Sequence, residues 1–164
     1  MREDLGYAQV HSEYDDMDRE IRASYFDAAG KPAVSIESGW ASYENIYSGS
    51  NKIETRYYDP QNNLTLRTDE NYASVKYQHD DYGQLTHVFY YGTDDQPVVN
   101  TRYHCAGCVY GYDERGYRTR IQYFGPDGSL MIRDDKGFAE EIREYDMSGN
   151  AVNVSRYDAE GNLL

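Results

Sequence analysis

The chain repeats itself with a period of about 33 residues. A Gly-aromatic-Ala motif, or a variant that keeps the alanine, recurs at intervals of 33, 32, 33 and 33 residues. Fixed spacing of this kind is typical of repeat proteins, in which each copy buries its apolar face against the next. The five motifs are Gly6-Tyr7-Ala8, Gly39-Trp40-Ala41, Asn71-Tyr72-Ala73, His104-Cys105-Ala106 and Gly137-Phe138-Ala139.

We therefore expect a single array over residues 1–164. Because the chain enters the first copy at its motif and stops partway through the fifth, we expect it to be part of a longer protein. The copies span 6–38, 39–70, 71–103, 104–136 and 137–164, and the last of them is truncated.

Each copy has two further landmarks, both aromatic and both followed by a turn. An aromatic residue or a histidine stands eight residues after the start of the copy, and an aromatic pair follows about twelve residues later. Most of these landmarks precede runs such as Asp-x-x-Gly, in which the carboxylate can accept nearby backbone N–H groups and glycine tolerates positive φ. Turns of this kind join antiparallel strands. The pairs are Tyr25-Phe26, Tyr57-Tyr58, Tyr90-Tyr91, Tyr123-Phe124 and Arg156-Tyr157.

Alternation of apolar and polar residues before each pair, as in Ile21, Ala23 and Tyr25, predicts a strand with one buried face. A shorter strand is expected after the second turn, for example over 32–36, and a third strand over 41–47. The fold class is therefore all-β, an array of antiparallel β-hairpins forming a solenoid or an extended twisted sheet. We expect the last aromatic of each pair to form a ladder whose inner three members are largely buried. These residues are Phe26, Tyr58, Tyr91, Phe124 and Tyr157.

Composition excludes several classes of partner. The formal net charge of -13 would repel a phosphate backbone, so we expect no nucleic-acid binding. No apolar run approaches the roughly 20 residues of a membrane span, and no apolar segment follows Met1-Arg2-Glu3-Asp4, so we expect neither a span nor a signal peptide. The aromatic fraction of 15% argues against a disordered chain.

Cys105 and Cys108 form the sharpest local motif. They could act as a redox dithiol or as half of a zinc site, but a structural zinc needs four ligands and no second paired motif exists. Cys105 also stands where other copies have an aromatic residue, and residues three apart in a regular strand point to opposite faces. We therefore expect two reduced, metal-free thiols that act as small hydrophobic side chains.

Acidic turns are a second candidate site, because carboxylates are preferred Ca²⁺ ligands. We favour turn formation and solubility as their role, and we expect no metal and no cofactor. The sequence has no nucleophile-base-acid set, and near-equivalent copies seldom build one unique catalytic site, so we expect no enzymatic activity. The acidic runs are Asp15-Asp16-x-Asp18, Asp80-Asp81, Asp94-Asp95 and Asp134-Asp135.

Aromatic side chains beside carboxylates and amides can also form sugar-binding surfaces. A ladder of stacked copies requires their shared spacing, whereas a ligand site does not, so we favour the core as their place and keep carbohydrate binding as the alternative. The candidates for binding are Trp40, Tyr43, Tyr72, Tyr77 and Tyr110, with Tyr47 and Tyr112 beside them.

Three segments resemble the YD repeats of bacterial rearrangement-hotspot and wall-associated proteins. They are Tyr112-Asp113-Glu114-Arg115-Gly116-Tyr117, Tyr145-Asp146-Met147-Ser148-Gly149-Asn150 and Tyr157-Asp158-Ala159-Glu160-Gly161-Asn162. The chain is also loosely similar to the Gly-Trp and Tyr-Tyr hairpin repeats that bind cell-wall polymers in Gram-positive bacteria.

The resemblance implies a hairpin array in a secreted or surface-exposed bacterial protein, acting as a shell, a spacer or an adhesive module. We therefore expect a non-catalytic structural or binding module. Its expected partners are a cell-wall polysaccharide, another protein or a further copy of this chain joined end to end.

Overall fold

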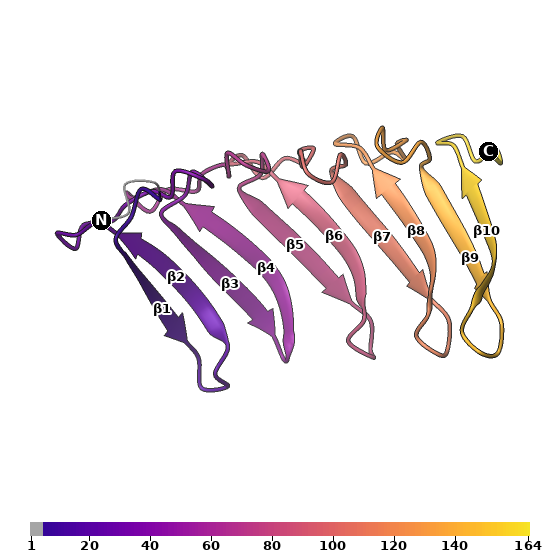
Figure 1. Cartoon of the computed structure of the whole chain (residues 1–164), viewed down its shortest axis with the longest axis horizontal. Coiled ribbons are helices and arrows are strands. Elements are labelled where there is room, and N and C mark those ends of the chain that lie inside the picture. Colours follow the sequence, from indigo (N-terminus) through magenta and orange to yellow (C-terminus); the bar gives the residue numbers. More distant parts are fainter. Residues whose placement is uncertain (1–4) are drawn as a thin grey trace. The chain divides into compact units, whose positions relative to one another are not determined.

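The computed structural model describes residues 5–164, and these residues fold into antiparallel β-hairpins (Figure 1). Strand order in the sheet follows the sequence, and the described residues contain no helix, which confirms the predicted all-β hairpin array. This part of the chain therefore has no helix long and apolar enough to cross a membrane. The strands are β1 (Gln9–Tyr14), β2 (Glu20–Phe26), β3 (Ser42–Ser48), β4 (Asn51–Tyr58), β5 (Ser74–His79), β6 (Leu85–Tyr91), β7 (Gly107–Tyr112), β8 (Arg118–Phe124), β9 (Glu140–Tyr145) and β10 (Ala151–Tyr157).

The chain divides into two compact units. Unit 1 comprises Met1–Lys76 and Tyr90–Gln96, and unit 2 comprises Tyr77–Phe89 and Pro97–Leu164. In unit 1 the hairpins β1–β2 and β3–β4 pair side by side through β2 and β3, and in unit 2 the hairpins β7–β8 and β9–β10 pair through β8 and β9. Each of these two junctions consists of three residue pairs, fewer than within a hairpin.

Most hairpin loops use one turn, in which an aspartate holds the backbone. In the β7–β8 loop, Asp113 Oδ1 accepts the N–H groups of Arg115 and Tyr117, and the backbone N–H of Gly116 donates to the Asp113 carbonyl. This is the predicted role of the Asp-x-x-Gly runs, which is therefore confirmed. The same pair of side-chain hydrogen bonds recurs at Asp15, Asp27, Asp59, Asp80, Asp113, Asp146 and Asp158.

Positive φ angles mark the first residue of each Gly-aromatic-Ala motif as well as the turns. Gly39 has a φ of 77°, and where glycine is missing the backbone keeps this conformation, with 62° at Asn71 and 52° at His104. Asparagine and histidine are among the non-glycine residues that adopt this region most readily. The five motifs thus share a backbone conformation as well as a sequence pattern.

Within each unit a buried alanine ties successive hairpins together. In unit 1 the N–H of Ala73 donates to the carbonyl of Tyr91, and the carbonyl of Ala73 accepts the N–H of Tyr57 in the preceding hairpin. In unit 2 Ala139 makes the same two bonds, to Tyr157 and Tyr123. Both alanines are fully buried, so no larger side chain fits without displacing a neighbour. The alanine of the motif is therefore a junction residue.

Aromatic rings form a row along one face of unit 1, the ring stack, in which the ring contacts range from stacked to edge-to-face. The middle residue of each motif alternates with the first aromatic residue of each pair in a continuous series of ring contacts. The centroid distances are 4.0 Å for Tyr7–Tyr25, 4.6 Å for Tyr25–Trp40, 5.5 Å for Trp40–Tyr57, 5.7 Å for Tyr57–Tyr72 and 4.9 Å for Tyr72–Tyr90. The rings inside this stack bury the area that a two-stranded hairpin cannot bury alone.

The predicted ladder was placed on the wrong face of the strands. Phe26, Tyr58, Tyr91, Phe124 and Tyr157 are only half-buried, whereas their preceding neighbours Tyr57, Tyr90 and Tyr123 are buried.

Adjacent residues of a strand point to opposite faces. The alternating apolar residues before each pair, such as Ala23 and Tyr57, lie on the buried face, whereas the last aromatic residue of the pair lies on the other. On the buried face, the guanidinium groups of Arg67 and Arg133 lie against aromatic rings. The guanidinium carbon of Arg67 lies 5.0 Å from the Tyr57 ring centroid, and that of Arg133 lies 4.7 Å from the Tyr123 ring centroid.

The predicted short strand after the second turn does not form. Pro32, Leu64, Leu130 and Leu163 each make a single bridge to the preceding strand. The chain then turns again, because the N–H of Gly39 donates to the carbonyl of Ser35 and starts the next motif. An extended strand therefore has no room between the second turn and the next motif. The expected strand over 41–47 is confirmed as β3.

We expect Tyr57→Ala to lower the free energy of unfolding by about 3–5 kcal/mol, because it empties a buried place between two rings. The ring lies between Trp40 and Tyr72, and its hydroxyl accepts a hydrogen bond from Arg67. Urea unfolding followed by circular dichroism measures the change. Tyr82→Ala is the matched control, because Tyr82 is 91% exposed. Equal, small effects of the two substitutions would contradict a core role for the stack.

The turn aspartates predict a pH dependence. Hydrogen bonds from the Asn150 side chain and from backbone amides hold the pKa of Asp146 below its usual value. The stabilisation is therefore present above the unfolded-state pKa of about 3.9 and is lost as the pH falls through the lowered pKa. We expect Asp146→Asn to lower the thermal midpoint at about pH 6, and the difference from wild type to shrink towards about pH 2.5.

Glu114→Gln, which removes one exposed negative charge, corrects this comparison for the change in net charge. A difference between wild type and Asp146→Asn that stays constant over the whole pH range would show that the carboxylate does not stabilise the turn.

Candidate functional site

The predicted sugar-binding aromatics differ in how open their rings are to solvent. Trp40 and Tyr72 are buried within the ring stack of unit 1. Tyr43 is half-buried in an edge-to-face contact with Trp40, and its hydroxyl donates to the Glu20 carboxylate. Burial, together with this bond, holds the pKa of Tyr43 above the usual range. Tyr77 is half-buried in β5. Stacking against a sugar requires an open ring face, which the two buried rings do not offer.

Tyr110 lines an open groove, together with Tyr112. The groove lies in unit 2 where the turn after β5 meets β7 and the turn after it, and its volume is about 710 Å³. Its rim carries the exposed ring of Tyr82, with Gln84 and Arg115 beside it. The Tyr112 hydroxyl donates to the Leu85 carbonyl over 2.8 Å, which fixes one wall. Tyr112 was among the predicted aromatics, whereas Tyr82 was not, because it lies in a turn rather than at a repeated aromatic position.

Of the aspartates in the predicted acidic runs, Asp15 and Asp80 bond the backbone of their own turns, while Asp95, Asp134 and Asp135 pair with basic side chains. Each carboxylate oxygen that accepts two backbone amides is less available to a cation, and the described residues contain no cluster of three or more His, Cys, Asp or Glu side chains with metal-binding geometry. Turn formation therefore accounts for the position of Asp15 and Asp80.

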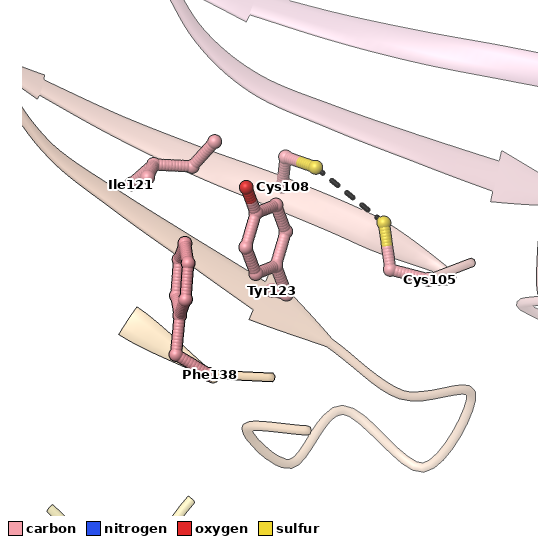
Figure 2. Close-up of a cluster of buried hydrophobic side chains, with 5 residues drawn as sticks. All are labelled: Cys105, Cys108, Ile121, Tyr123 and Phe138. Carbon is pink, nitrogen blue, oxygen red and sulfur yellow. Dashed lines mark hydrogen bonds between the residues drawn. The ribbon is translucent and has the colours of Figure 1, made fainter. Parts of the chain in front are cut away.

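The two cysteines are in the buried cluster of unit 2. Figure 2 shows their sulfur atoms facing each other beside Tyr123, with Ile121 and Phe138 completing the cluster. The Sγ–Sγ distance is 3.5 Å, and both thiols are free. The expectation that the two side chains point to opposite faces was wrong. Cys105 precedes β7, and its irregular backbone turns the side chain towards Cys108.

The surroundings of the thiols are unequal. The hydrogen bond between the thiols and burial raise the pKa of Cys105. The same hydrogen bond lowers the pKa of Cys108, with help from the Tyr110 hydroxyl and the positive charge of Arg133 and against the effect of burial. The guanidinium of Arg133 is held by Asp135 over 2.6 Å. Proton loss from this pair therefore favours Cys108, with Cys105 as the remaining donor.

Sequence reasoning did not identify Arg133 as a neighbour of the cysteines. The repeat spacing contains a sequence signal for this position, because Arg67 and Arg133 both stand five residues before the middle residue of a motif. In both places the backbone N–H of the arginine donates to the carbonyl of that residue, Tyr72 or Phe138. Asn100 occupies the same position before Cys105 and makes the same bond.

Comparison of the chain with protein-family models and with curated proteins finds no match.

Proposed function

We propose that this chain is a non-catalytic structural and binding repeat module of a bacterial surface or secreted protein. In this proposal, residues 1–164 form one array of five copies that joins hairpins edge to edge. The observation that carries it is the alanine junction, because the same two backbone hydrogen bonds join successive hairpins in both units. A junction made from backbone groups and a methyl group can accept any hairpin of the same kind. The bacterial setting rests on the resemblance to YD repeats.

The outer edge of β10 supports a binding role. Val154 in β10 corresponds to Ile121 in β8, and Ile121 is 9% exposed because β9 pairs beside it. Val154 is 46% exposed. An exposed apolar residue on an edge strand makes that edge a template for another strand. The best-matched occupant is a second copy of this chain, whose β1 is exposed along its whole length.

We expect reversible self-association that strengthens with salt. The net charge of -13 opposes contact at low ionic strength, and screening shortens the range of this repulsion to about 10 Å at 0.1 M salt. Sedimentation velocity at low and at moderate salt measures it.

Val154→Lys is the control, because a lysine on a strand edge disfavours pairing while it lowers the overall negative charge. Its association should be weaker at both salt concentrations. A wild-type chain that remains monomeric at both concentrations would contradict edge pairing.

A carbohydrate-binding function is the second candidate, and the groove of unit 2 favours it. An exposed tyrosine ring next to amide, carboxylate and guanidinium groups is suited to stack on a sugar and bond its hydroxyls. This alternative places the ligand at Tyr82 and Tyr110.

We expect Tyr82→Ala to weaken binding to a cell-wall polysaccharide at least about tenfold if the groove is the site, since it removes the stacking ring. Isothermal titration with soluble cell-wall fragments measures the affinity. Tyr14→Ala removes an exposed tyrosine of unit 1 and should leave binding unchanged. Equal affinities of wild type and Tyr82→Ala, or absence of binding by wild type, would rule out this site.

A further inference from the structure

We propose that Cys105 and Cys108 are an oxidation site, at which a hydroperoxide converts the two thiols into an intramolecular disulfide. This inference concerns unit 2 alone and does not depend on the proposed structural function.

The backbone holds the two sulfur atoms together. The N–H of Asn100 donates to the carbonyl of Cys105, and the N–H of Ala106 donates to the carbonyl of Phe124 in β8. These bonds fix the irregular backbone before β7 and hold the Sγ atoms 3.5 Å apart. A disulfide needs a separation of about 2.0 Å, so the two sulfur atoms must approach each other by about 1.5 Å.

The burial of the two thiols sets the order of reaction. Cys105 is fully buried, whereas Cys108 retains 5% exposure. The Tyr110 hydroxyl and the Arg133 guanidinium also favour a thiolate at Cys108. Thiolates with access to solvent and a neighbouring second cysteine are those that react with peroxides. Cys108 is therefore the attacking cysteine and Cys105 the resolving one.

The chemistry balances with hydrogen peroxide as the oxidant. The Cys108 thiolate attacks one peroxide oxygen, the O–O bond breaks, and the product is a sulfenic acid with hydroxide as the leaving group. The hydroxide removes the proton of Cys105. The new thiolate attacks Sγ of Cys108, the S–O bond breaks, and the departing hydroxide is protonated to water. Two thiols and one peroxide thus yield one disulfide and two waters.

The position of Cys105 gives the disulfide a structural role. Other copies place Trp40, Tyr72 or Phe138 at this point of the motif, and each is buried in ring contacts. A sulfur atom offers less contact area than an aromatic ring. A disulfide to Cys108 would join the segment before β7 to β7 itself by a covalent bond and so compensate for the missing ring.

The test uses the full chain, reduced and then freed of reductant. After exposure to hydrogen peroxide and removal of the excess by catalase, the protein is denatured, alkylated and weighed by mass spectrometry. We expect loss of both alkylatable thiols and of two hydrogens from the mass, reversed by dithiothreitol, with the protein still a single chain on a non-reducing gel. Two alkylatable thiols, a disulfide-linked dimer or a sulfinic acid as the main product would overturn the proposal.

Single variants test the order of reaction. In Cys105→Ala we expect a sulfenic acid at Cys108 that is trapped by dimedone. In Cys108→Ala we expect Cys105 to be labelled at least about tenfold more slowly, because it is fully buried. Equal labelling in the two variants would overturn the assigned roles.

A bulky oxidant tests whether the reaction takes place in the folded protein. We expect glutathione disulfide to oxidise the native chain at least about tenfold more slowly than the chain in concentrated urea, since burial keeps this oxidant out. Hydrogen peroxide should not show this difference. Peroxide oxidation as strongly suppressed by folding as glutathione oxidation would mean that only unfolded chains react, and would overturn the proposal. The circular dichroism spectrum of Cys105→Val/Cys108→Val, expected to match wild type, controls for unfolding by loss of the thiols.

Discussion

Backbone hydrogen bonding by one small residue underlies the rest of the structure. A hairpin of two strands is marginal in water, so each hairpin here depends on its neighbour. The motif alanine joins them, because its N–H serves its own hairpin and its carbonyl serves the preceding one. The residue before it, in the middle of the motif, is thereby brought over the aromatic residue of the preceding strand, as with Trp40 over Tyr25. The ring stack is thus a consequence of the junction.

The fold class could be predicted because its signals are local. Alternation before the aromatic pairs predicted the long strands, such as β8. The Asp-x-x-Gly runs predicted the turns, and the structure contains their hydrogen bonds. The alternation before each pair indicated the face that is buried, but the ladder was assigned to the opposite face, because Tyr57 and Tyr58 are both aromatic and ring type alone does not distinguish them. In the structure Arg67 lies against the buried ring of Tyr57. The prediction of a short strand after the second turn was wrong, because a period of two in the sequence does not reveal that the chain turns again at Ser35.

The candidate sites were less predictable than the fold. Each candidate site is formed by residues that are distant in the sequence or that lie where the backbone is not a regular strand. Tyr82 and Tyr110 line one groove although they belong to different copies of the repeat. The groove forms only because the turn after β5, which carries Tyr82, lies beside β7. The meeting of Cys105 and Cys108 depends on a backbone that is not yet a strand, so the rule of alternating faces did not apply to it. Spacing identified the two cysteines but gave the wrong geometry.

Strand order that follows the sequence has a consequence for how the chain reaches its folded state. Every hairpin closes a short loop, and in each unit the next hairpin pairs with a segment that has just been formed. Closure of short loops has a small entropic cost, and proteins rich in local contacts fold faster than those with distant pairings. Folding of each unit can therefore nucleate at any one hairpin and propagate to the next, which suits a chain that emerges gradually from the ribosome.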